Sequence, residues 1–199
     1  MDTFLSLNSE KILKGELEIK KSRFLSFARY VNSSEEAEEF LRGIKKEHNS
    51  AKHVAFAYRL LNVSRASDDG EPSGTAGKPM LGLLEKMELF NVVVVVVRYF
   101  GGIKLGAGPL LRAYVDSASQ VLIPPFWVYE KCIKADIEVD FKEFEQILPY
   151  SLKHKIVTQD VQFSEKVKLC VIYPKNFEKT FKNENNKKEI YYSFGVKNV

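Results

Sequence analysis

The sequence predicts an α+β protein of two domains, residues 1–130 and residues 131–199. The first observation is a run of six valines, residues 92–97, between two glycine-rich loops. Such an uninterrupted apolar run is typical of a central strand with both faces covered. The composition then changes near Ile123-Pro124-Pro125, after which the chain has no arginine and only one of its 11 glycines. The elements predicted beyond this point follow the order β-α-β-β-α-β, which is the ferredoxin-like pattern.

The first domain is predicted to be an α/β layer sandwich rich in strands. Residues 17–19 and 23–31 are typical of strands. Ser33 followed by Glu36 forms a capping-box pattern that begins a helix. The apolar stripe of this helix has the 3.6-residue period and consists of Ala37, Phe40, Leu41 and Ile44.

Three further elements surround the valine strand. Residues 53–62 alternate between apolar and polar side chains, as in a strand. A short helix is expected over residues 80–88. A second helix is expected over residues 109–122, because proline suits the first helical position.

The second domain is predicted to contain strands at residues 133–141, 156–163, 166–173 and 190–196. Helices are expected at residues 142–155 and 177–188. Pro149 lies inside the first of these helices and is expected to break or kink it, because proline lacks the amide hydrogen.

Composition leaves several classes of partner open. The net charge of +4 permits a nucleic-acid or ribosome partner without requiring one. Cys132 and Cys170 lie in apolar strand-like runs, which suits small buried side chains better than a disulfide framework. The sequence shows no secretion signal, and its longest apolar run is far too short to span a bilayer. We therefore expect a cytoplasmic protein.

The first glycine-rich loop carries an acidic cluster. Its signature residues are Asp68, Asp69, Gly70, Glu71, Gly74 and Gly77. The three carboxyl groups suit either a hard cation or an acid/base pair in a hydrolase. The other interpretation is a turn whose carboxylates accept backbone amides or pair with arginines.

Known catalytic and cofactor patterns are not matched. The loops depart from the spacing of a Walker-type loop and of a dinucleotide fingerprint. His48, His53 and His154 do not form a metal set, and neither cysteine has zinc spacing. We therefore predict no catalytic residue, no metal and no cofactor.

Basic side chains and glycines suggest a surface that contacts an anion. Arg98, Lys104 and Lys78 lie in or beside the glycine loops, and Arg112 lies in the helix that follows. The amino end of that helix favours anions, and Tyr99 and Phe100 offer a stacking platform. The predicted contact residues are therefore Arg98, Lys104, Lys78, Arg112, Gly101, Gly102 and Gly106. An equally weighted alternative is that Arg98 and Arg112 neutralise Asp68, Asp69 or Glu71, so that the two loops lock each other.

Four segments together resemble the IMPACT family, in its bacterial branch called YigZ. They read AKHVAFAYR at residues 51–59, SDDGEPSGTAG at residues 67–77, VRYFGGIKLG at residues 97–106 and RAY at residues 112–114. The resemblance covers residues 22–122. The second half resembles the smaller carboxy-terminal domain of the bacterial members.

The resemblance implies a fold and a field of activity. It implies that the first domain is similar to the second domain of ribosomal protein five and to domain four of elongation factor G. It implies that the second domain is similar to domain five of elongation factor G. Eukaryotic members regulate translation under amino-acid starvation. Some members carry a proline-dipeptidase label, which the His and acidic residues of this chain do not support.

The leading hypothesis is a non-enzymatic regulator or binding protein associated with translation, whose partner is RNA, the ribosome or a translation factor. In this hypothesis the glycine loops and their cations form the contact. The alternative is a small-molecule or peptide hydrolase that uses Asp68, Asp69 and Glu71.

Overall fold

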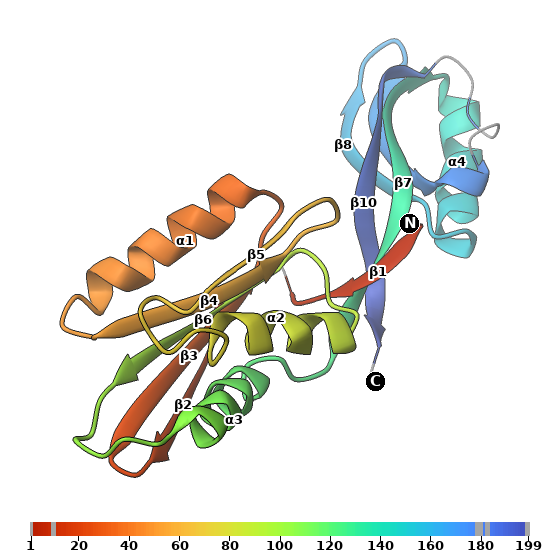
Figure 1. Ribbon diagram of the computed structural model, residues 1–199. Coiled ribbons are helices and arrows are strands. Elements are labelled where there is room, and N and C mark those ends of the chain that lie inside the picture. The colour runs from red at the N-terminus through yellow and green to blue at the C-terminus, as the bar shows by residue number, and fades with distance from the viewer. Residues whose placement is uncertain (1, 9–10, 178–180, 182–183, 198–199) are drawn as a thin grey trace. The chain divides into compact units, whose positions relative to one another are not determined.

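The computed structural model describes residues 2–8, 11–177, 181 and 184–197. It divides into two compact units, whose helices and strands are labelled in Figure 1. One unit is Leu5–Trp127, to which Lys197 is also assigned. The other is Val128–Val196, together with the described residues that precede Leu5.

The first unit is built on a five-stranded antiparallel sheet with the valine strand at its centre. The strand order is β2 (Leu13–Ile19), β3 (Ser22–Tyr30), β6 (Val92–Tyr99), β4 (His53–Arg59) and β5 (Ser64–Ser67). All six valines of β6 are completely buried. The prediction of a central strand with two covered faces is confirmed.

Helices cover both faces of this sheet. Helix α1 (Ser34–Glu47) lies on one face, and α2 (Gly77–Lys86) and α3 (Ala107–Ser119) lie on the other (Figure 1). Because side chains alternate along a strand, Val93, Val95 and Val97 pack in the core below α1. The remaining valines of β6 pack in the core below α2 and α3.

The predicted helices of this unit are present, with shifted ends. The Ser33 hydroxyl accepts a hydrogen bond from the Glu36 amide, and the predicted apolar stripe of α1 is buried. Helix α2 begins three residues before the predicted start, and α3 begins two residues before Pro109. Strand β4 ends at Arg59, and β5 follows as a strand that the sequence pattern did not predict.

The second unit is a sheet with strand order β10 (Asn185–Lys197), β7 (Phe126–Val139), β9 (Val167–Pro174) and β8 (Val157–Phe163). Strand β1 (Thr3–Ser6), which was not predicted, also pairs with β7. Phe144 and Ile147 of helix α4 (Phe141–Lys153) pack on the core of this sheet.

Two predictions for this unit need correction. Helix α4 continues through Pro149, so the predicted break is wrong. Its start is held by Asp140, whose carboxylate accepts the Glu143 amide while the Glu143 side chain accepts the Asp140 amide. The second predicted helix, residues 177–188, is wrong at its end, because β10 already begins at Asn185. A short 3-10 helix, η1 (Lys175–Phe177), precedes it, and residues 178–180 and 182–183 lie outside the described part.

No helix among the described residues has both the length and the apolar character needed to cross a bilayer.

Candidate functional site

The two glycine-rich loops meet at a buried ion pair. Arg98, near the end of β6, donates from Nη1 to Glu71 Oε1 at 2.7 Å and to Oε2 at 3.0 Å. The Tyr114 hydroxyl of α3 donates to the same Oε1 at 2.8 Å. The side chains of Arg98 and Glu71 are only 6% and 3% exposed. The alternative in which the two loops hold each other through paired charges therefore applies to Arg98, which pairs with Glu71 of the first loop.

The alternation of β6 explains why Arg98 points inward. Arg98 lies on the same face as Val94 and Val96, below α2 and α3. In the sheet register it stands opposite Phe24 of β3 and His53 of β4. Its guanidinium carbon lies 5.4 Å from the centre of the Phe24 ring, and the flat cation is favoured by that contact.

The environment of Tyr114 reflects the buried carboxylate. Burial and the negative charge of Glu71 raise the pKa of the Tyr114 hydroxyl far above its usual value. Tyr114 therefore keeps its proton and remains a hydrogen-bond donor to Glu71.

Asp68 organises the first loop and caps α2. One of its oxygens accepts the amides of Ala76 at 2.9 Å and Gly77 at 2.8 Å. The other accepts the amide of Gly74 at 2.8 Å. Burial acts to raise the pKa of Asp68, but these three hydrogen bonds outweigh it and the pKa is lowered. The capping by a distant carboxylate explains why α2 begins before its predicted start.

Asp69 is also fully engaged. Its carboxylate accepts the Val54 amide at 2.7 Å and pairs with Lys45 at 2.8 Å. The Asp69 carbonyl oxygen lies 2.9 Å from His53 Nδ1. A carbonyl can only accept, so Nδ1 of His53 carries a hydrogen. Each carboxylate of the acidic cluster thus has a partner of its own.

The signature glycines are required by the backbone. A Cβ on Gly101 would lie 2.1 Å from the Lys21 carbonyl group, and a Cβ on Gly77 would lie 2.6 Å from the Ser67 backbone. Close approach of two chain segments therefore excludes any side chain at these positions. The remaining signature and contact glycines have positive φ angles, namely Gly70, Gly74, Gly102 and Gly106.

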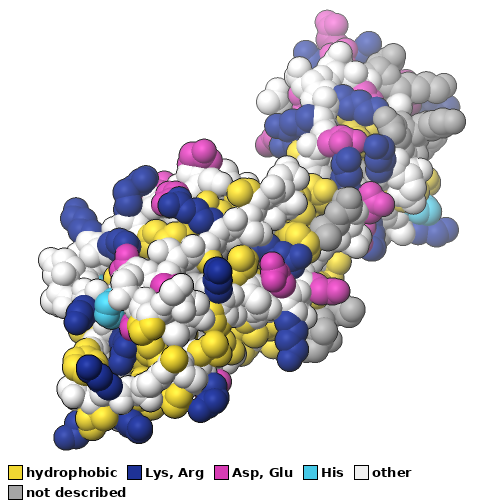
Figure 2. All heavy atoms as spheres, in the orientation of Figure 1, with side chains coloured by type: hydrophobic (Ala, Val, Ile, Leu, Met, Phe, Trp, Pro, Cys, Tyr) yellow, Lys and Arg dark blue, Asp and Glu magenta, His cyan; other side chains and the backbone are white. Residues whose placement is uncertain are grey.

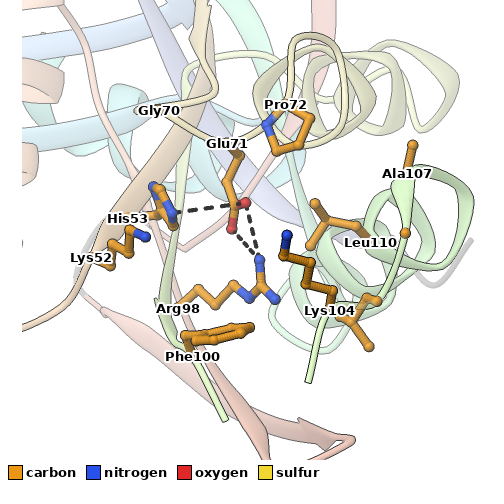
Figure 3. A pocket seen from close by; sticks show the side chains of 12 residues that line it. Lys52, His53, Gly70, Glu71, Pro72, Arg98, Phe100, Lys104, Ala107 and Leu110 are labelled. Carbon is orange, nitrogen blue, oxygen red and sulfur yellow. Dashed lines mark hydrogen bonds and ion pairs between the residues drawn. The ribbon is translucent and has the colours of Figure 1, made fainter. Parts of the chain in front are cut away.

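A cleft of about 480 Å³ opens beside the ion pair (Figure 3). His53 and Arg98 line it from strands β4 and β6, Lys52 lines it from the position directly before β4, and Lys104 lines it from the second loop. The first residues of α3 contribute the wall opposite the strands, and the complete lining is Lys52, His53, Gly70, Glu71, Pro72, Arg98, Phe100, Lys104, Leu105, Gly106, Ala107 and Leu110.

The predicted contact residues fall into different places. Lys104 is exposed and lines the cleft. Lys78 and Arg112 are exposed but do not line it, and Arg112 makes no ion pair with the acidic cluster among the described residues. Arg98 lines the cleft from a buried position, where it pairs with Glu71. Lys52 was missed as a contact residue, although it belongs to the family-like segment at residues 51–59 and lies directly before β4.

A metal site finds no support in the residues that the structure describes. They contain no group of three or more His, Cys, Asp or Glu side chains that could hold an ion. Cys132 and Cys170 are buried free thiols in the second unit, and burial raises the pKa of both.

Charges on the visible surface are mixed. Figure 2 shows Lys and Arg side chains interspersed with Asp and Glu over both units, without one continuous basic field on this face. An anion would therefore be held by a local arrangement of groups, such as the cleft, more than by the overall charge.

Comparison with known proteins identifies the first unit. Residues 20–122 match the family model described as the Impact N-terminal domain. The IMPACT family member YvyE of Bacillus subtilis is 51% identical over 110 residues, which are 54% of this chain and 51% of that protein. The IMPACT family member YigZ of Escherichia coli is 44% identical over 110 residues, which are 53% of this chain and 54% of that protein. The chain thus matches about half the length of these relatives.

A solved structure is similar over both units. It is a crystal structure described as that of an hypothetical protein, with 28% identity and a TM-score of 0.65 over 90% of this chain and 89% of that one. The family model covers the buried ion pair, both glycine loops and the cleft. The chain therefore belongs to the IMPACT family and is similar to its bacterial YigZ-type members.

Proposed function

We propose that this chain is a non-enzymatic binding protein associated with translation, and that the cleft beside Arg98 is its contact site for RNA or the ribosome. The observation that carries the proposal is a pair of exposed lysines, Lys52 and Lys104, in one cleft. Neither makes an ion pair with a described residue. Unpaired cations at a concave surface attract anions such as the phosphates of RNA.

The role in translation is supported by family membership. The resemblance given above implies that eukaryotic IMPACT proteins regulate translation, and that the two domains are similar to domains four and five of elongation factor G. In this proposal the second unit provides a further contact with RNA, the ribosome or a translation factor. In this proposal Lys78 and Arg112, which are exposed but do not line the cleft, contact the partner outside it.

The hydrolase alternative gains no support from the carboxylates. A general base needs a carboxylate that is free to accept a proton from water or substrate. Asp68 is held by three amides, Asp69 by an amide and Lys45, and Glu71 by Arg98 and Tyr114. Using any of them in catalysis would first require breaking these contacts.

Binding of the full chain to purified bacterial ribosomes and to a short single-stranded oligoribonucleotide tests the proposal. We expect Lys52→Ala/Lys104→Ala to weaken binding at low salt. Removal of two phosphate contacts is expected to make the slope of log affinity against log salt shallower by about 1.4. The matched control is Lys11→Ala/Lys86→Ala, which removes two exposed lysines outside the cleft and is expected to bind normally.

Two results would overturn the proposal. One is no affinity of the folded protein for ribosomes or RNA at low salt. The other is equal affinity of both double variants and the unaltered chain, because the cleft lysines would then make no contact.

A further inference from the structure

The cleft carries more positive charge than its own acid neutralises. Among the described residues that line it, Glu71 alone is acidic, and Arg98 already compensates it. Lys52 and Lys104 therefore remain as two net positive charges, and both extend toward the cleft in Figure 3. A carboxylate would supply one negative charge. A phosphomonoester carries between about 1.5 and 2 negative charges at neutral pH, and it matches the two lysines better.

Arg98 keeps unused donors although it is nine-tenths buried. Only its Nη1 bonds to Glu71. Its Nε is buried without a hydrogen-bond partner, and no described residue accepts from Nη2. The buried Nε has no accessible surface for a ligand, whereas Nη2 is not among the fully buried unpaired atoms. An unpaired donor is costly, so an acceptor in the cleft that reaches Nη2 would stabilise the guanidinium.

The amino end of α3 adds free backbone donors. Its first residue, Ala107, lines the cleft, and the helix has no side-chain cap. No described residue accepts from the amides of Ala107 or Gly108. In contrast, the amide of Gly77, the first residue of α2, donates to Asp68. Free amides and the helix dipole favour an anion with several oxygens at this wall.

The rest of the cleft suits an organic group attached to that anion. Pro72, Leu105 and Leu110 form an apolar wall, and Phe100 is 48% exposed. The volume of about 480 Å³ lies within the usual range for small-molecule sites, roughly 300–1,000 Å³. A phosphate alone would leave most of this volume unfilled.

From these four observations we infer that the cleft binds a phosphomonoester, with the phosphate between Lys52, Lys104, Arg98 and the start of α3. The apolar wall receives the attached group, for which a nucleoside has suitable size and surface. The inference rests on the proposed function, since it names the ligand of the same cleft. The phosphate belongs either to the terminus of an RNA chain or to a free nucleoside monophosphate.

Three probes of the full chain separate these sources. They are AMP, a short oligoribonucleotide with a 5′-phosphate, and the same oligoribonucleotide with a 5′-hydroxyl. We expect the 5′-phosphate to tighten binding about tenfold or more, which corresponds to about one charge-assisted hydrogen bond. Lys52→Ala/Lys104→Ala is expected to abolish this preference, whereas Lys11→Ala/Lys86→Ala retains it.

The outcomes distinguish this inference from the proposed function. If both oligoribonucleotides bind equally and AMP does not compete, the inference fails and RNA binding stands. If AMP binds in the cleft and neither oligoribonucleotide binds, the inference holds for a free phosphorylated compound and the RNA contact fails. Selective binding of the 5′-phosphorylated chain supports the terminus as the source. No binding of any phosphorylated probe to the folded chain overturns the inference.

Discussion

Removal of either partner of the Arg98–Glu71 pair is expected to destabilise the first unit strongly. The two side chains are 6% and 3% exposed, and the closest nitrogen–oxygen distance is 2.7 Å. Opposite unit charges about 4 Å apart attract by about 4 kcal/mol at an effective dielectric constant of about 20. Removing one partner of a buried pair also leaves the other charge uncompensated. We therefore expect Arg98→Met and Glu71→Gln each to lower the free energy of unfolding by about 3–5 kcal/mol.

The double variant provides the decisive comparison. Arg98→Met/Glu71→Gln leaves no uncompensated charge, and the glutamine oxygen can still accept from Tyr114. Its loss of stability is expected to fall short of the sum of the single losses by about 2–3 kcal/mol.

Urea unfolding followed by circular dichroism measures these differences. Because the two units need not unfold together, hydrogen exchange of the β6 amides provides a separate value for the first unit. Losses that add to within about 0.5 kcal/mol would refute the reasoning, since the two charges would then act independently.

Three further predictions concern the loops and the thiols. Gly101→Ala is expected to lower the free energy of unfolding by about 1–3 kcal/mol, because the new Cβ would overlap the Lys21 backbone. The control Gly43→Ala, inside α1 with open space around it, is expected to raise the free energy of unfolding by about 0.5–1 kcal/mol. Urea unfolding that ranked the two variants in the reverse order would contradict the close approach at Gly101. Because the pKa of Asp68 is lowered in the folded state, its ionised carboxylate stabilises the fold above a pH of about 4, and this stabilisation is lost as the pH falls through the folded-state pKa. Asp68→Asn is therefore expected to lower the free energy of unfolding by about 1–2 kcal/mol at neutral pH. The variant is also expected to lose less stability than the unaltered chain when the pH is lowered. If the free energy of unfolding of Asp68→Asn fell with acid pH as steeply as that of the unaltered chain, this role of Asp68 would be contradicted. Cys132 and Cys170 are expected to react with a thiol reagent only after unfolding, because both are buried and their thiols stay protonated; rapid labelling of the native chain would oppose this.

Much of the fold could be predicted because its signals are local. The valine run specifies a strand covered on both faces, and the Ser33 cap with its apolar stripe specifies α1. Helix α2 began earlier than predicted because Asp68 reaches amides eight and nine residues along the chain. A cap supplied from such a distance has no fixed sequence spacing.

The charged residues of the candidate site could be identified from the sequence, but the direction of their side chains and their partners could not. Arg98 and Glu71 are 27 residues apart, and their contact depends on how β6 and the first loop are placed by the sheet. For the same reason, the position of Lys52 in the cleft could not be predicted from the sequence. Lys52 lines the cleft because the register of β4 and β6 places its neighbour His53 opposite Arg98. Register between strands that are distant in sequence is a property of the folded sheet.

The central claim is that anions bind in the cleft beside Arg98. Its most direct test is a titration of the isotope-labelled full chain with the 5′-phosphorylated oligoribonucleotide, followed through the backbone amide signals. We predict that the largest shifts occur at Gly106, Ala107 and Gly108, together with the neighbours of Lys52 and Lys104, and that Lys52→Ala/Lys104→Ala removes them. Shifts confined to the second unit, with the signals of the cleft unchanged, would contradict the account.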